Sequence, residues 1–181
     1  MLRKILLIPL LLACSLAQAQ SPTQIMWDQL IPEGWDPYEL FDQYTEEEYN
    51  ALSDEEYYEL QKKAQEMLTR APVVEHLDGK QVRIPGFVVP LEHEGTSVSQ
   101  FLLVPYFGAC IHTPPPPANQ VIKGSLTEAY VLESITQPVW ITGMLQTGLV
   151  SSKLGEAGYN FFTDVNSGYS MKVDIIEPYV Q

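Results

Sequence analysis

Two segments of the chain, residues 82–88 and 139–145, share the pattern Val-x-Ile-x-Gly followed by two apolar residues. Alternation with a period of two predicts β-strands, and a glycine inside a strand marks a bulge or a sharp bend. A bent strand can pair on both of its sides, which favours closure of the sheet. The sequence therefore predicts a mainly β fold. We expect a small five- to six-stranded barrel like the oligonucleotide/oligosaccharide-binding (OB) fold, with an N-terminal helical extension; the alternative is a β-sandwich.

Three more segments have the composition of strands: residues 98–106, 159–165 and 169–177. Ser167-Gly168 lies between the last two and predicts a hairpin turn there. Residues 121–134 indicate a short strand followed by either a second strand or a helical turn.

The chain divides into three parts that differ in composition. They are a signal peptide (1–19), an acidic, aromatic-containing N-terminal arm with a helix (20–71), and a β-barrel-like domain (72–181). Residues 28–66 hold 13 of the 23 acidic residues. Within them, the spacing of Thr45 to Glu48 and of Ser53 to Glu56 is that of two capping boxes, which predicts helix over residues 44–68.

The first residues predict export. Arg3 and Lys4 precede a short apolar run, and an Ala-x-Ala site ends at Ala19. This is the pattern of a secretory signal peptide, so we expect the mature protein in the periplasm. The alternative is a lipoprotein, because Leu11–Cys14 resembles a lipobox that would leave a lipid anchor on Cys14. No later segment is long and apolar enough to predict a membrane span.

The net charge excludes one class of partner. Removal of residues 1–19 takes away two bases and no acid, so the formal charge changes from −13 to −15. Nucleic acids and anionic lipids are bound through clusters of basic side chains, and a chain this acidic is not expected to bind them.

A second feature is the stretch Cys-Ile-His-Thr-Pro-Pro-Pro-Pro, which begins at Cys110. In extended backbone, Cys110 and His112 point to the same side, about 6.5 Å apart. The segment Pro114–Pro117 then extends for about 12 Å as a stiff polyproline helix. We expect this rigid segment to fix the direction of His112 or to offer an apolar surface to a partner.

Three interpretations of Cys110 and His112 stay open. They are buried or hydrogen-bonded structural residues, metal ligands, or a catalytic thiol–imidazole pair. A thiolate and an imidazole suit zinc or copper, and His93 and His76 are the available supplementary ligands. Catalysis is the least favoured interpretation, because the sequence provides no recognisable third orienting residue or oxyanion hole.

The strand at 82–88, the cysteine–histidine–proline block and the strand at 139–145 together resemble the bacterial exported proteins of domain-of-unknown-function family 3299, over about residues 72–178. The resemblance implies little chemistry, because the family's activity is not established. It implies a genetic association with ABC-transporter components linked to zinc or other transition metals, which favours the metal interpretation of Cys110 and His112. The neighbouring Asn119 and Gln120 are expected to bond the carbonyls of the proline segment.

These observations lead to one preferred function and two alternatives. We expect a non-enzymatic periplasmic accessory or binding protein of an envelope ABC-transport system, with zinc as the candidate metal at Cys110 and His112. One alternative is a thiol-dependent envelope enzyme that uses the same two residues. The other is a structural interaction module that docks a protein partner on Pro114–Pro117.

Overall fold

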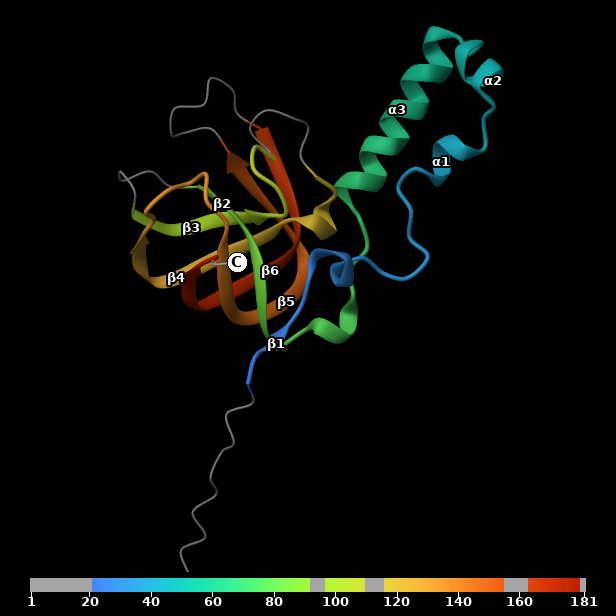
Figure 1. Ribbon diagram of the computed structural model, residues 1–181. Helices are drawn as coiled ribbons and strands as arrows, with labels where there is room; N and C mark the ends of the chain where they lie inside the picture. Colours follow the sequence, from blue (N-terminus) through green and yellow to red (C-terminus); the bar gives the residue numbers. More distant parts are fainter. Residues whose placement is uncertain (1–20, 92–96, 110–115, 155–162, 180–181) are drawn as a thin grey trace, which may run out of the picture.

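The computed structural model describes residues 21–91, 97–109, 116–154 and 163–179 (Figure 1). Its six strands are β1 (Thr23–Gln24), β2 (Gln81–Pro90), β3 (Ser97–Val104), β4 (Ile122–Val131), β5 (Val139–Leu154) and β6 (Thr163–Pro178). The sheet order is β1-β2-β3-β4-β6-β5, and a further pairing of β2 with β5 closes a five-stranded barrel. All barrel pairs are antiparallel except β4 with β6, and β1 adds in parallel to β2. The predicted small OB-like barrel is confirmed.

The two segments with the shared pattern are partners in the barrel. In the register of β2 with β5, Gly86 lies opposite Val139 and Val82 lies opposite Gly143. β2 pairs with β5 up to Gly86 and with β3 from Phe87 onward, so Gly86 is where the strand changes partner. A methyl group on Gly86 would lie 2.8 Å from the Leu103 side chain, and space is therefore available only for glycine.

Gly143 lies at a second irregularity, where the register of β5 with β6 shifts between Thr142 and Gly143. A methyl group there would overlap the carbonyl oxygen of Lys172 on the neighbouring strand. Both glycines thus allow a close approach of neighbouring strands, which is how a short strand bends round a small barrel.

The barrel interior is filled by one large apolar cluster and a smaller one. The large cluster includes the inward-facing residues of both patterned strands and the fully buried Phe101 and Tyr169. The smaller cluster consists of Val89, Leu102, Val104, Ala109, Val121, Leu154 and Val165. Burial of each large aliphatic or aromatic side chain contributes about 1.5–3 kcal/mol, so these two clusters are the main source of stability.

The predicted hairpin turn at Ser167-Gly168 is wrong. β6 runs without interruption through both residues, and neither has the backbone of a turn. Gly168 is needed for packing instead, because a methyl group there would lie 2.8 Å from the Val73 side chain and 3.0 Å from the Ala118 carbonyl oxygen. Ser167 is fully buried, and its hydroxyl donates to the Val150 carbonyl at 3.2 Å.

The N-terminal residues before the helices are part of the barrel. β1 is followed by the 3-10 helix Trp27–Leu30, and Ile25 and Leu30 are buried in the large cluster. The Tyr169 hydroxyl donates to the Leu30 carbonyl at 2.8 Å and accepts from the Val74 amide at 2.7 Å. The Trp27 indole donates to the Pro85 carbonyl at 2.6 Å. This segment is therefore fixed beside β2 by both hydrogen bonds and burial.

The helical part of the arm consists of α1 (Glu39–Asp42), α2 (Glu46–Asn50) and α3 (Asp54–Thr69). Both predicted capping boxes are present, but Ser53 begins a new helix, so the single helix expected over residues 44–68 is divided in two. The Ser53 hydroxyl and amide donate to the Glu56 carboxylate at 2.6 and 2.9 Å. These bonds lower the pKa of Glu56 because they favour its charged form.

The three helices pack on one another around an apolar cluster of their own, built on Leu40, Leu60 and Ala64. Figure 1 shows this helical arm projecting from one side of the barrel. None of the helices in the described ranges is long and apolar enough to cross a membrane.

Candidate functional site

Cys110, His112 and His93 lie outside the residues that the structure describes, as does Cys14. The residues on either side of the segment that holds Cys110 and His112 are described. Ala109 is fully buried in the smaller cluster, and Pro116 is buried as well. Leu91, two residues before His93, packs against the same cluster. The chain therefore enters and leaves the cysteine–histidine segment at anchored positions.

His76 is exposed on the 3-10 helix Glu75–Leu77. Its neighbour Glu75 accepts a hydrogen bond from the Thr147 hydroxyl at 3.2 Å, which ties the helix to β5. Leu77 belongs to the large cluster, whereas Ala109, next to Cys110, belongs to the smaller one. Within the described ranges, no three His, Cys, Asp or Glu side chains come together in a way that could hold a metal ion.

Asn119 and Gln120 hold the end of the proline segment in place. The Asn119 amide donates to the Pro72 carbonyl at 2.9 Å, and the Gln120 amide donates to the Trp27 carbonyl at 2.9 Å. A structural role was expected for both residues, with the carbonyls of Pro114–Pro117 as partners. The carbonyls that accept these two bonds belong instead to Trp27 in the N-terminal arm and to Pro72 just after α3. The segment is thus fastened to the N-terminal part of the chain.

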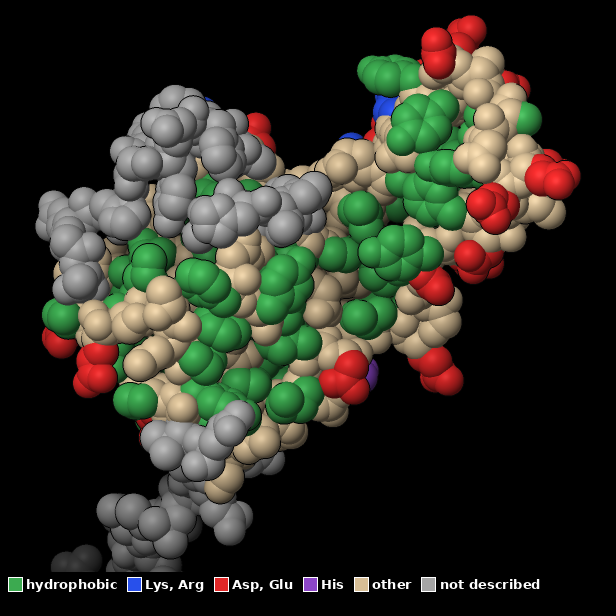
Figure 2. Space-filling model, turned by 45° about the horizontal axis from the view of Figure 1, so that its top comes forward, with side chains coloured by type: hydrophobic (Ala, Val, Ile, Leu, Met, Phe, Trp, Pro, Cys, Tyr) green, Lys and Arg blue, Asp and Glu red, His purple; other side chains and the backbone are tan. Residues whose placement is uncertain are grey.

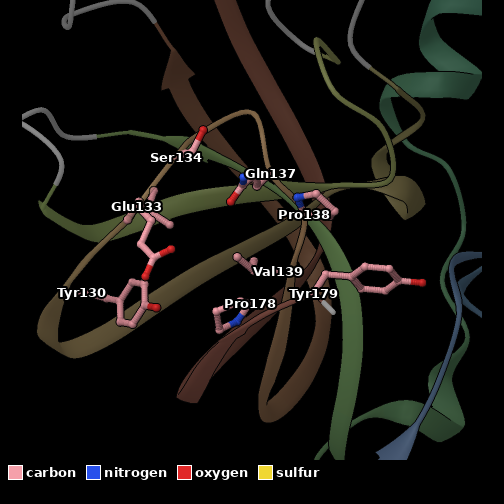
Figure 3. A pocket seen from close by; sticks show the side chains of 9 residues that line it. Tyr130, Glu133, Ser134, Gln137, Pro138, Val139, Pro178 and Tyr179 are labelled. Carbon is pink, nitrogen blue, oxygen red and sulfur yellow. The ribbon is translucent and has the colours of Figure 1, made fainter. Parts of the chain in front are cut away.

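A pocket of about 480 Å³ lies where β4 ends, β5 begins and β6 ends. Leu132 and Val139, both buried, form its floor. The remaining lining residues are Tyr130, Glu133, Ser134, Gln137, Pro138, Pro178 and Tyr179. Figure 3 shows the Glu133 carboxylate beside the Tyr130 ring on one side and Gln137 with Pro138 on another. We call this the β4–β5 pocket.

The β4–β5 pocket combines an apolar interior with a few polar groups at its rim. Glu133 and Gln137 are exposed and supply hydrogen-bond acceptors, and the amide of Gln137 also donates. The connection that carries them is ordered by its own bonds, since the Ser134 hydroxyl accepts from the Thr136 amide at 3.2 Å. The arrangement suits an apolar group that carries a hydrogen-bond donor or a positive charge.

One lining residue of the pocket, Tyr179, belongs to a stack of side chains beside it. The ring of Tyr179 stacks on that of Trp140, with centroids 5.3 Å apart and planes at 24°. The guanidinium of Arg83 lies 4.2 Å from the centre of the Trp140 ring and pairs with the Glu177 carboxylate at 3.2 Å. A cation over an exposed aromatic ring contributes about 0.5–1 kcal/mol. These contacts restrict Tyr179, which is one of the lining residues of the pocket.

The model of a family described as "protein of unknown function (DUF3299)" matches residues 27–178. The chain belongs to the DUF3299 family. The match begins well before the expected residue 72, so the acidic helical arm is a part of the DUF3299 chain and not an addition to it. No protein with a curated description is similar enough to match.

A crystal structure of a DUF3299 family protein from Pseudomonas aeruginosa is similar to this chain at 33% sequence identity and a TM-score of 0.62. The similarity covers 90% of this chain and 99% of the other. It therefore extends over both the barrel and the arm.

Sequence reasoning missed the β4–β5 pocket of this DUF3299 protein. Its lining residues come from three separate stretches, and none of them carries a motif. The available signal was weak: Pro138 precedes one strand and Pro178 ends another, and Val139 and Pro178 are partners in the register of β5 with β6. Only that register brings the two prolines together.

Proposed function

We propose that this DUF3299 protein is a non-enzymatic binding protein of the bacterial envelope, an accessory of an ABC-transport system. The proposed periplasmic location rests on the N-terminal sequence, in which a basic start, an apolar run and an Ala-x-Ala site follow one another. The proposed transport role rests on the association that the family resemblance implies.

The observation that carries the binding role is the β4–β5 pocket. Its volume of about 480 Å³ is that of a typical ligand site, and it combines a buried apolar floor with convergent polar groups. Tyr179, one of its lining residues, stacks on Trp140. An ordered lining residue loses little conformational entropy on binding, which favours affinity.

Site-specific photo-crosslinking in living cells tests this role. A photoreactive amino acid at Gln137, which is exposed at the rim, is expected to give one discrete adduct with another envelope protein, identified by mass spectrometry. The same residue at Lys153, which is exposed on β5 outside the pocket, is the matched control. If both positions give the same adducts, or Gln137 gives none, the pocket is not the binding site.

A transition metal at Cys110 and His112 is a second part of the proposal. It rests on the thiol and the imidazole that stand two residues apart in the sequence, and on the association that the family resemblance implies. A thiolate and an imidazole suit zinc. Elemental analysis of the purified mature protein is expected to give close to one zinc per chain, lost in Cys110→Ser and in His112→Ala.

His76→Ala and His93→Ala, measured in the same way, identify any further ligand among the histidines. Absence of zinc from the wild-type protein would overturn the metal proposal and leave the pocket unaffected. If Cys110 were then alkylated readily at pH 6–7, its thiol would be activated and the enzyme alternative would be favoured.

A further inference from the structure

β4 and β6 are partners over only a short stretch of the barrel wall. Their parallel pairing joins Ile122–Ser125 to Tyr169–Lys172 and goes no further. Both strands continue beyond it, β4 to Val131 and β6 to Pro178. Within the described ranges, residues 173–178 of β6 pair with β5 on one side and with no strand on the other. β6 therefore ends with one open edge.

The register of β6 with β5 decides which backbone groups face the open edge. In an antiparallel pair, successive residues direct their amide and carbonyl groups alternately toward the partner strand and away from it. The Tyr179 amide donates to the Pro138 carbonyl at 3.1 Å, so Tyr179 and Glu177 face β5. Ile176 and Pro178 then face the open edge, where the described part of the chain provides no hydrogen-bond partner for their backbone groups.

The proline at the end of β6 fits an edge position. Proline has no amide donor, and within sheets it is confined to positions where no partner strand needs one. The open edge thus offers the amide of Ile176 and the carbonyls of Ile176 and Pro178. Such unpaired groups bind an extended chain through main-chain hydrogen bonds, as a further strand of the sheet.

The β4–β5 pocket lies at the end of the open edge. Tyr130 near the end of β4 and Pro178 at the end of β6 both line it (Figure 3). The side chain of Ile176 is buried in the large cluster and so points to the barrel interior. A residue opposite Ile176 on an added strand directs its side chain to the same face, on which Leu132 and Val139 form the pocket floor.

The charge around the open edge is negative. Residues 126–139 and 173–178 contain no lysine or arginine, and their four carboxylates are those of Glu128, Glu133, Asp174 and Glu177. Arg83 pairs with Glu177, and the other three carboxylates have no ion pair within the described ranges. Figure 2 shows Asp and Glu side chains at the left edge of the barrel, the side on which β4 lies in Figure 1, and no Lys or Arg beside them. Basic side chains are therefore attracted to this region.

We propose that the open edge of β6 binds an extended segment of a partner protein, in which apolar side chains alternate with basic ones. The segment adds to β6 as a further strand. Its backbone bonds to Ile176 and Pro178, its apolar side chains enter the β4–β5 pocket, and its basic side chains lie outside, near the carboxylates. This inference rests on the proposed binding role of the pocket and specifies the chemistry of the partner.

Synthetic peptides test the proposal with the full mature protein. The probe is a fluorescent octapeptide in which valines and lysines alternate, and its control is an isomer with its valines consecutive. By fluorescence anisotropy in about 150 mM NaCl, we expect the alternating peptide to bind at least about tenfold more tightly than the isomer. Equal binding of the two peptides would overturn the proposal.

Two N-methylated forms of the alternating peptide test the backbone bonds. One carries methyl groups on the amides of its two central valines, and the other on those of its two central lysines. A strand added to an edge uses every second amide, so one form should lose at least about tenfold in affinity and the other less than about twofold. Equal effects of the two methylations would mean that no strand is formed.

Hydrogen exchange locates the strand on this protein. Saturation with the alternating peptide should slow exchange of the Ile176 amide at least about tenfold, because that amide gains a partner. The Glu177 amide faces β5 and is the internal control, with an expected change below about twofold. An Ile176 amide that exchanges at the same rate with and without peptide would place the strand elsewhere and overturn the proposal.

A pair of charge variants separates local from diffuse attraction. Glu133→Lys, at the rim of the pocket, is expected to weaken binding of the peptide about fivefold. Glu66→Lys, which is exposed on α3, is expected to weaken it less than about twofold, because distant charges are screened. Equal effects would mean diffuse attraction to an acidic protein and would overturn the proposal.

Crosslinking at Gln137 keeps this inference distinguishable from the proposed function. A discrete adduct at Gln137, together with equal effects of the two N-methylations, would retain the pocket as a binding site and remove the added strand. Absence of any adduct would count against the pocket itself.

Discussion

The hydroxyl of Tyr169 joins three distant parts of the chain, and its removal gives the sharpest test of how the fold is held. It donates to the Leu30 carbonyl at 2.8 Å and accepts from the Val74 amide at 2.7 Å. Leu30 belongs to the N-terminal segment, Val74 to the linker after α3, and Tyr169 to β6. The side chain of Tyr169 is fully buried.

Tyr169→Phe keeps the ring and removes both hydrogen bonds. A buried polar group left without a partner costs about 1–3 kcal/mol. Leu30 is fully buried, so its carbonyl bears the full penalty, whereas Val74 is half-buried and its amide can recruit water. We therefore expect the free energy of unfolding to fall by about 2–4 kcal/mol at pH 7. For a domain of this size the melting temperature should fall by about 5–15 °C.

The assay is urea denaturation at equilibrium, followed by tryptophan fluorescence. Tyr130→Phe is the control, because the Tyr130 hydroxyl has no hydrogen bond within the described part of the chain, and we expect a change below about 0.5 kcal/mol. A loss below about 0.5 kcal/mol for Tyr169→Phe as well would refute the reasoning. It would mean that the two backbone groups find other partners without cost.

The same residue predicts how stability depends on alkaline pH. Burial raises the pKa of Tyr169, because the interior disfavours the phenolate. Its contribution is fully present below about pH 10, the ordinary tyrosine value, and is lost as pH rises from there through the raised pKa of the folded state. The fall in stability above pH 10 should be shallower in Tyr169→Phe than in the wild-type protein. An identical fall in both would show that Tyr169 does not titrate with unfolding.

Three further predictions follow from the glycines and the capping boxes. Gly143→Ala should destabilise the protein by about 3 kcal/mol or more, because the added methyl group overlaps the Lys172 backbone. The control is Gly34→Ala, which has open space around it but a φ of +77°, and which should cost about 1 kcal/mol. Equal losses of stability in urea denaturation would refute the packing argument. Ser53→Ala should destabilise α3 by about 1 kcal/mol, and the amides of its first turn should then exchange their hydrogens faster. If their exchange rates do not rise, Ser53 does not stabilise the helix as a cap. Because the pKa of Glu56 is lowered, its contribution to α3 is present above about pH 4.5 and is lost as pH falls through the lowered value. The far-UV helical signal that is lost on acidification should therefore be smaller in Glu56→Gln than in the wild-type protein. An equal loss in both would mean that the Glu56 carboxylate does not cause the acid dependence.

The barrel was predictable because its signal is local. The period of two and the glycine of each patterned strand follow from adjacent residues, and the glycines lie where a partner strand changes or the register shifts. The capping boxes were predictable for the same reason, since each joins residues three positions apart.

The misplaced turn shows where local reasoning fails. Ser-Gly is a common turn sequence, but Gly168 serves to admit Val73 and Ala118 against β6, and both are distant in sequence. The β4–β5 pocket was missed for the same cause, because the register of β5 with β6 decides which residues line it. The residues that the sequence did select, Cys110 and His112, remain a prediction.

The position of β6 has a consequence for the order in which the molecule can assemble. This last strand lies between β4 and β5 and pairs with both, so a chain that has emerged only as far as Leu154 has two open sheet edges and an unfilled interior. Closure of the barrel therefore waits until residues 163–178 are available, from whichever end the chain is delivered. A truncation before residue 163 should leave a product with unpaired edges, prone to aggregation.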